Sequence, residues 1–282
     1  MKNNLGFSLV ELAVVMMVIG LLLAGAMIPL STQLEVRSVT ETQRILEQIK
    51  ESITGFAQTN GYLPCPALGT LATGATNAGI EDRGAISGTC NSTSGVVPWA
   101  TLGVPEADAW GNRFSYWVVQ SFADNVSLNT TNGPTQAGTS AATCGYSFLS
   151  PAPTNSSFAL CSLGNLTVNT RSDTHATTAV AQNLPLVIIS HGKNGYGAWR
   201  GTGGKLNASG DLDSNFVPDT NDDEETNATA GSTSFIYRYR VSSSTGCSDT
   251  VNGSQFCEFD DIVVWISSNL LISKMIAAGK LP

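Results

Sequence analysis

Charged side chains are scarce in this 282-residue chain, and histidine is almost absent. Only 13% of the residues are Asp, Glu, Lys or Arg, and the two histidines are His175 and His191. Acidic residues outnumber basic ones by 22 to 14, so the formal charge of −8 provides no overall positive field for a phosphate backbone. Nucleic-acid binding is therefore not expected.

The motifs of common catalytic sites are missing as well. The sequence has no GxSxG elbow, no HExxH, no P-loop and no GxGxxG ahead of a helix. Ser190 precedes His191, but neighbouring residues on a strand point to opposite faces, so these two do not form a nucleophile and its base. We therefore expect a protein that is not an enzyme.

No CxxC motif or Cys/His cluster with zinc spacing occurs, although the chain has six cysteines. An even number in a chain rich in Ser, Thr, Asn and Gly favours disulfides in an oxidising compartment over metal ligation. The cysteines fall into three local couples: Cys65 with Cys90, Cys144 with Cys161, and Cys247 with Cys257. Six cysteines allow fifteen connectivities, so this pairing is one hypothesis among several.

One long apolar run near the N-terminus contains a single charged residue. From Phe7 to Leu30 there are 24 residues, and Glu11 is the only charged one. This length crosses the roughly 30 Å hydrocarbon core of a bilayer as a helix, and Lys2 ahead of it favours a cytoplasmic start. A cleaved secretory signal has a shorter apolar run followed by a small-residue site, which does not fit here. The run predicts a single-pass transmembrane segment.

Glu11 requires an explanation, because a carboxylate in the bilayer interior costs on the order of 2.5–3.5 kcal/mol. One explanation is that it lies shallowly and reaches the headgroups. Another is that cleavage between Gly6 and Phe7 creates an α-amine four residues before Glu11. Across two packed subunits this amine and the carboxylate would neutralise each other. Such a buried pair fixes register, because misalignment leaves both charges unpaired.

The N-terminal segment resembles the signature of type IV pilins and type II secretion pseudopilins, in the run G-FSLVELAVVMMVIGLLLAG. In that family a prepilin peptidase cuts after the Gly and methylates the new N-terminal Phe, and the Glu at the fifth processed position is needed for filament assembly. The resemblance implies processing at Gly6 and Phe7 and assembly through Phe7 and Glu11. It also implies three partners: other pilins or pseudopilins, the prepilin peptidase, and the inner membrane before assembly.

Helical periodicity continues beyond the apolar run. Asn60-Gly61 followed by Pro64 indicates where the helix ends. A helix from about residue 8 to 59 would be roughly 75–80 Å long at 1.5 Å per residue. Its second half is amphipathic, with apolar residues in steps of three, four and seven at Val39, Leu46, Ile49, Ile53 and Phe56.

Short β-rich runs bounded by turn formers follow this helix. They predict strands within 114–120, 184–190, 235–241 and 261–267, and residues 269–282 read as a short terminal helix. The Ser/Thr/Asn/Gly-rich region 121–182 is expected to be loop, pinned by Cys144 and Cys161. The expected fold is α+β: a lollipop whose long helix packs on a mostly antiparallel sheet with long loops. Its expected parts are a leader (1–6), a transmembrane or filament-core helix (7–30), an amphipathic helix (31–60) and a globular head (61–282).

Segments of the head extend the resemblance. The run VPEADAWGNRFSYWV is similar to a pseudopilin segment, with Asp108, Trp110, Gly111 and Phe114 in the matching places, and IISHGKNGYGA is similar to a turn that follows a sheet strand in the same proteins. Trp110 as a core anchor and Gly111 as a turn residue account for these motifs without a site. The runs YLPCPA and GTCNSTSGVVPWATLG are similar to disulfide-containing, minor-pilin-like members.

The most site-like stretch is GDLDSNFVPDTNDDEE, residues 210–225. Ca²⁺ takes six to eight hard oxygen ligands, and carboxylates at alternate positions can surround one ion. Phe216 stands where an EF-hand requires Gly, so the loop is not an EF-hand. It is either a solvated acidic loop or a calcium site, with these candidate ligands: Asp211, Asp213, Asn215, Asp219 and Asp222.

These observations predict a structural subunit of a type IV pilus or related filament. The predicted head, 61–282, is longer than a typical major pseudopilin head, which favours a minor-pilin-like role. The alternatives are a pseudopilin of a type II secretion system and a non-polymerising, membrane-anchored periplasmic binding domain. We expect a single pass of the bacterial inner membrane with the head in the periplasm, then a periplasmic or cell-surface filament.

Overall fold

The computed structural model describes residues 9–85, 88–125, 156–206, 223–241 and 247–281, without the side chains of residues 22–32. The chain divides into two compact units, Met1–Glu41 and Thr42–Pro282. Helix α1 spans Leu9–Asn60 and contributes to both. An N-terminal helix was expected from the sequence, whereas the predicted domain boundaries and the lollipop shape stay predictions.

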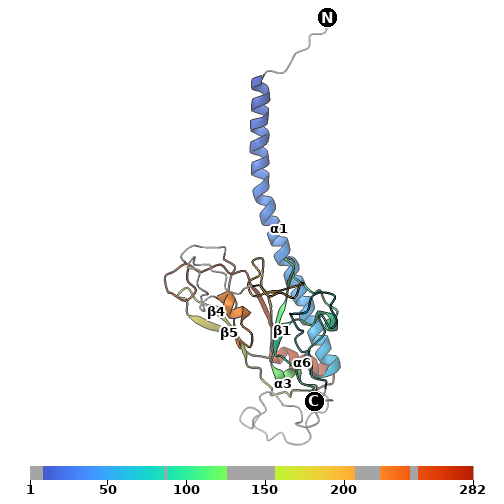
Figure 1. Cartoon of the computed structure of the whole chain (residues 1–282). Helices are drawn as coiled ribbons and strands as arrows, with labels where there is room; N and C mark the ends of the chain where they lie inside the picture. The colour runs from blue at the N-terminus through green and yellow to red at the C-terminus, as the bar shows by residue number, and fades with distance from the viewer. Residues whose placement is uncertain (1–8, 86–87, 126–155, 207–222, 242–246, 282) are drawn as a thin grey trace, which may run out of the picture. The chain divides into compact units, whose positions relative to one another are not determined.

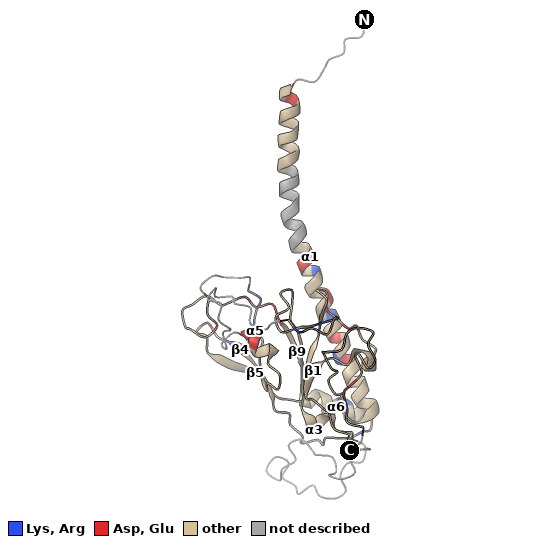
Figure 2. Cartoon of the chain, viewed as in Figure 1, with Lys and Arg blue, Asp and Glu red and all other residues tan. Residues whose placement is uncertain are grey.

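The first unit consists of the N-terminal part of α1, which is nearly free of charge between Leu9 and Leu21 (Figure 2). No helix formed by the described residues has the length and apolar character needed to cross a membrane. The membrane span expected at 7–30 is therefore not shown. Residues 7 and 8, and the side chains of residues 22–30, lie outside the described part of that range.

In the second unit, one face of α1 enters the main core. Its buried residues Ile45, Leu46, Ile49, Ile53 and Ala57 follow the helical period and join one apolar cluster. The helix ends where Gly61 adopts a φ of 86° and its N–H donates to the Ala57 carbonyl over 2.7 Å.

The larger sheet packs against this face of α1 (Figure 1). It is antiparallel, with the order β1 (Ser94–Val96), β3 (Ser115–Val118), β6 (Leu186–Ser190) and β9 (Ile262–Ile266). Tyr116 and Ile188 belong to the α1 cluster, while Trp117 and Val187 belong to a second cluster on the opposite face. Three of these strands lie within predicted runs, because their β-branched and aromatic residues are bounded by turn formers.

A three-stranded sheet contributes to the second cluster. Its order is β5 (Thr177–Leu184), β4 (Leu166–Arg171) and β8 (Ser234–Ile236), with β4 antiparallel to β5 and parallel to β8. The expectation of loop throughout 121–182 is therefore wrong at Leu166–Arg171 and from Thr177 onward, and it is also wrong at residues 121–123, which belong to the short helix α3 (Gln120–Ala123). Threonine and asparagine suggested turns there, but Val168 is fully buried and alternates with polar residues that face outward.

The remaining elements connect these layers. They are α2 (Trp99–Leu102), α3 (Gln120–Ala123), α5 (Asp223–Ala228), α6 (Ser268–Ala277), and the pair β2 (Asn112–Arg113) and β7 (Trp199–Arg200). The Ser267 side chain caps α6 by accepting from the Leu270 N–H. The predicted terminal helix is thus present, and it ends at Ala277, just before Gly279 in the left-handed region. Mixed helix and mainly antiparallel sheet agree with the expected α+β class.

Disulfides link two of the predicted couples. Cys65 is bonded to Cys90, and Cys247 to Cys257. Cys161 is also disulfide-bonded, but Cys144, its predicted partner, lies outside the described residues.

Candidate functional site

The processing residues Gly6 and Phe7 lie outside the described residues, whereas Glu11 lies in the first turn of α1. A carboxylate at this end of a helix interacts favourably with the helix dipole. Around Glu11 the apolar side chains are exposed: Leu9 by 86%, Met17 by 68% and Leu21 by 65%. So much apolar surface requires a lipid or protein partner.

The predicted calcium ligands Asp211, Asp213, Asn215, Asp219 and Asp222 all lie outside the described residues. Immediately after them in the chain, α5 carries Glu224 into a buried acidic cluster that the sequence analysis missed. One carboxylate oxygen from each of Glu224, Asp260 and Asp261 lies within 4.8 Å of the others. We call these three residues the acidic cluster.

The acidic cluster joins α5 to the turn after β6 and to the start of β9. A Glu224 oxygen accepts the Asp260 N–H over 2.8 Å, and Asp260 Oδ2 accepts the Lys193 and Asn194 N–H groups over 2.8 and 3.0 Å. Gly192 permits this approach, because a Cβ there would lie 2.2 Å from Asp260 Oδ1. The glycine turn predicted from GKNGYG therefore holds a carboxylate in place.

Two oxygens of the acidic cluster are buried without a hydrogen-bond donor among the described residues: Asp260 Oδ1 and Asp261 Oδ1. The latter lies 3.4 Å from His191 Nδ1, while Asp261 Oδ2 accepts the Asn227 amide over 2.9 Å. Burial, with the neighbouring Asp261 charge adding to it, raises the pKa of Asp260 to about 6. Close buried carboxylates are stable only with protons or a cation.

The donor set of the acidic cluster suits a hard cation. Three carboxylates supply oxygens, the ligand atoms that Ca²⁺ and Mg²⁺ prefer, and two of those oxygens have no hydrogen-bond donor among the described residues. Six to eight ligands complete a calcium shell, so further oxygens would have to come from elsewhere in the chain or from water.

Next to the acidic cluster, buried ion pairs fix the beginning of α5. Asp223 accepts from Arg171 over 2.7 Å and from Arg238 over 2.8 Å, and Arg238 also donates to Asp249 over 2.9 Å. Burial raises the pKa of Asp223, while the hydrogen bond from Arg171 opposes this shift. These four side chains anchor α5, and no spacing in the sequence pointed to their meeting.

Asp108, in the run that resembles a pseudopilin segment, is a buried hydrogen-bond acceptor and not part of a surface site. Asp108 accepts the Trp110 and Asn112 N–H groups, each over 2.9 Å, and the Ser190 hydroxyl over 2.7 Å. Burial raises the pKa of Asp108, while the Ser190 hydrogen bond opposes this shift. Trp110 itself is half-buried, and the Arg240 guanidinium carbon lies 5.9 Å from the centroid of its ring. Its expected role as a core anchor is therefore wrong.

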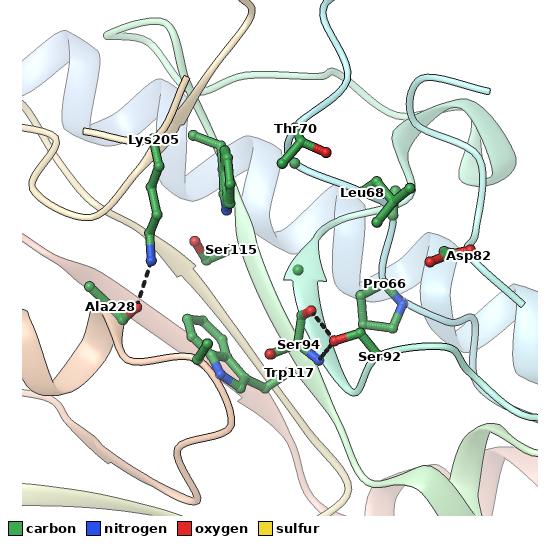
Figure 3. Close-up of a pocket in the computed structure, with 15 residues that line it drawn as sticks. Pro66, Leu68, Thr70, Asp82, Ser92, Ser94, Ser115, Trp117, Lys205 and Ala228 are labelled. Atoms are coloured by element: carbon green, nitrogen blue, oxygen red, sulfur yellow. Dashed lines mark hydrogen bonds between the residues drawn. The ribbon is translucent and has the colours of Figure 1, made fainter. Parts of the chain in front are cut away.

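Ser190 and His191 contact different partners, as expected for neighbours at a strand end. His191 Nε2 lies 2.8 Å from Ser115 Oγ, and its other ring nitrogen faces Asp261. Ser115 lines a cavity of about 170 Å³, together with Trp117, Lys205 and residues of the 66–70 segment (Figure 3). The Lys205 ammonium donates to the Ala228 carbonyl over 3.0 Å, and burial lowers its pKa.

Residues 1–27 match the family model for the prokaryotic N-terminal methylation motif. This motif is the prepilin-type signature of type IV pilins and pseudopilins, and it confirms the resemblance recognised in the sequence. Neither the comparison with curated proteins nor that with solved structures gives a match.

Proposed function

We propose that this protein is a minor-pilin-like structural subunit of a type IV pilus or a related filament. The prepilin peptidase cuts it between Gly6 and Phe7 and methylates Phe7. The subunit crosses the inner membrane once before assembly, with its head in the periplasm. It then enters a filament through its N-terminal helix.

The observation that carries this proposal is the match of residues 1–27 to the N-terminal methylation motif. The exposed apolar surface of α1 between Leu9 and Leu21 gives it a physical basis. A helix that is apolar all round is stable only in lipid or among similar helices. Before assembly, lipid would surround this helix of the subunit. In the filament, the same helix would lie among the N-terminal helices of other subunits.

Glu11 is proposed to align the subunits. After cleavage, the Phe7 amine of one subunit and the Glu11 carboxylate of its neighbour neutralise each other in an apolar filament core. The net stabilisation from such a buried pair is small, but a shifted register leaves two buried charges without partners. The pair therefore selects one register among many apolar ones.

The test compares Glu11→Ala with Glu35→Ala in the full-length protein. We expect Glu11→Ala to insert in the membrane and to be processed, but to be lost from the filament fraction. Glu35→Ala should assemble normally, because it lies outside the motif. Normal assembly of Glu11→Ala would contradict the proposal and favour a membrane-anchored periplasmic domain that does not polymerise.

A pseudopilin of a type II secretion system remains the second candidate. The N-terminal methylation motif supports this candidate equally. A pilus subunit and a secretion pseudopilin differ in where the processed protein resides. A subunit found in sheared surface filaments fits a pilus, whereas one confined to the envelope fits a secretion pseudopilin.

We further propose that the head binds Ca²⁺ at the acidic cluster. Additional candidate ligands come from the sequence just before it: Asp211, Asp213, Asn215, Asp219 and Asp222. The unsatisfied oxygens of Asp260 and Asp261 support this proposal. The full-length protein in detergent should melt at a higher temperature in millimolar Ca²⁺ than in chelator. An identical midpoint in the two conditions would refute calcium binding.

A further inference from the structure

The outer edges of the two larger sheets are not all protected. The β1 edge is covered by Ala67, which exchanges two backbone hydrogen bonds of 2.8 and 3.0 Å with Val96. The β8 edge is covered by the Asn227 side chain, which pairs with the Ile236 N–H and carbonyl over 2.8 and 2.9 Å. Among the described residues, no strand pairs with the outer side of β5 or of β9. Within the described part of the chain, two edges are thus left open.

A groove of about 590 Å³ follows the open edge of β9. Four consecutive residues of this strand, Ile262 to Trp265, line it, and they include side chains from both faces of the sheet. Helix α1 forms one wall through Gln43, Glu47 and Lys50, and Tyr237 lies on the other side. A groove that meets both faces of one strand runs along its edge, where an extended segment could continue the sheet.

The other open edge belongs to β5, the longest strand of the described residues. Its eight residues, TTAVAQNL, contain no charge, and six of them are exposed on both faces of the strand. Val180 in its middle is 47% exposed. Natural proteins protect such an edge with charges, proline, bulges or a covering segment. Of these, β5 has only bulges, since Val180 and one of residues 182–183 are extra relative to β4. An exposed edge without charge or proline favours a pairing surface.

We propose that β5 of one copy adds to β9 in the groove of the next copy. An uncharged segment suits this groove, because β9 carries no charge and the Glu47–Lys50 pair in the wall, with its charged atoms 3.0 Å apart, is neutral as a whole. β5 meets this condition. Backbone hydrogen bonds between the strands supply the contact, as in other strand additions. The inference rests on the proposed function, since a filament subunit places copies side by side.

The two strands differ, so the contact is heterologous. Repetition of a heterologous contact produces an open helical chain of copies where its rotation does not close into a ring. Strand pairing between heads would therefore reinforce assembly along the fibre, in addition to packing of the N-terminal helices.

The test is disulfide cross-linking between copies of the full-length protein. Val180→Cys is co-expressed with Ile262→Cys or, to cover a shift in register, with Val264→Cys. Opposite residues of paired strands have Cα atoms about 4.5–5.5 Å apart, which a disulfide spans. We expect a cross-linked dimer only in cells that contain both variants. Val251→Cys, exposed outside both sheets, is the matched control and should give no dimer with either partner.

The outcomes separate this inference from the proposed function. A dimer formed by Val180→Cys alone would mean that β5 pairs with itself, which overturns the proposal. Filaments that assemble normally without any mixed cross-link would overturn the strand pairing and leave the filament role intact. A processed chain that never assembles would overturn both.

Discussion

The Asp260 N–H donates to a Glu224 carboxylate oxygen over 2.8 Å, so the backbone at the start of β9 holds a side chain of α5. Through this contact two carboxylates approach each other inside the head, next to Asp261. Their mutual repulsion is unfavourable in a buried place, and a bound cation would relieve it.

Substitution in the acidic cluster should remove the effect of calcium. In Asp261→Asn, one ligand charge is lost while an amide of similar shape remains, so the rise of the melting midpoint in Ca²⁺ should disappear. The matched control is Asp173→Asn, an exposed carboxylate in the turn between β4 and β5. A calcium-induced rise that persists in Asp261→Asn would place the ion elsewhere.

The protonation of Asp260 predicts a pH dependence in chelator. Burial raises its pKa from 3.8 to about 6 in the folded state. Between these values the folded state binds more protons than the unfolded one, so the free energy of unfolding falls as pH rises through about 4 to 6. The free energy of unfolding decreases by on the order of 3 kcal/mol, and this decrease is complete above the folded-state pKa of Asp260.

Asp260→Asn should have a shallower slope in that window. Asp108 and Asp223 also have a raised pKa and titrate in the same direction, so the difference between variant and wild type is the quantity to measure. Denaturant titrations of both proteins at several pH values provide it. Parallel curves would show that Asp260 titrates near its ordinary value.

Arg113 should be essential for stability although it is charged. It is fully buried, donates to Glu106 over 2.7 Å and to the carbonyls of Gly69 and Leu71 over 2.9 and 2.7 Å, and lies over the Trp99 ring. Arg113→Met removes the donor to the buried Gly69 carbonyl and the ion partner of Glu106, which is partly exposed and keeps the Thr73 hydroxyl as a donor. We expect a cost of about 2–4 kcal/mol.

Denaturant unfolding of Arg113→Met measures this cost. Arg200→Met, at an exposed position on the partner strand β7, is the control and should change the free energy of unfolding by less than about 0.5 kcal/mol. Equal effects of the two substitutions would mean that the interactions of Arg113 are replaced by water.

The Cys65–Cys90 disulfide should stabilise the segment that packs near the end of α1. It closes a loop with a sequence separation of 25, for which chain entropy predicts about 3.5 kcal/mol. Replacing both cysteines by Ala should lower the free energy of unfolding by about that amount. A change below about 1 kcal/mol would show that the reduced chain already holds this loop closed.

Local sequence patterns predicted the elements whose apolar residues repeat regularly. Helix α1 follows a 3.6-residue period, and β3, β6 and β9 are short runs of β-branched and aromatic residues. β4 and β5 were missed because their threonines and asparagines are also turn formers. Only the tertiary contacts of Val168 and Leu184 identify them as strands.

The same difference between local patterns and tertiary contacts applies to the candidate site residues. Gly6, Phe7 and Glu11 form a fixed local spacing, so the signature is readable from the sequence. The acidic cluster joins residues from α5 and from the start of β9, which are distant in the chain. Asp260 and Asp261 stand next to each other before an apolar strand, and this pair of carboxylates was the signal that could have suggested a site.

The most direct test of the account is the mass of the N-terminal peptide of the protein purified from bacterial envelopes and from sheared filaments. We expect a peptide that begins at Phe7 and carries one additional methyl group, present in the filament fraction. A chain that still begins at Met1 or Lys2 in both fractions would contradict processing, and with it the proposed role of Glu11.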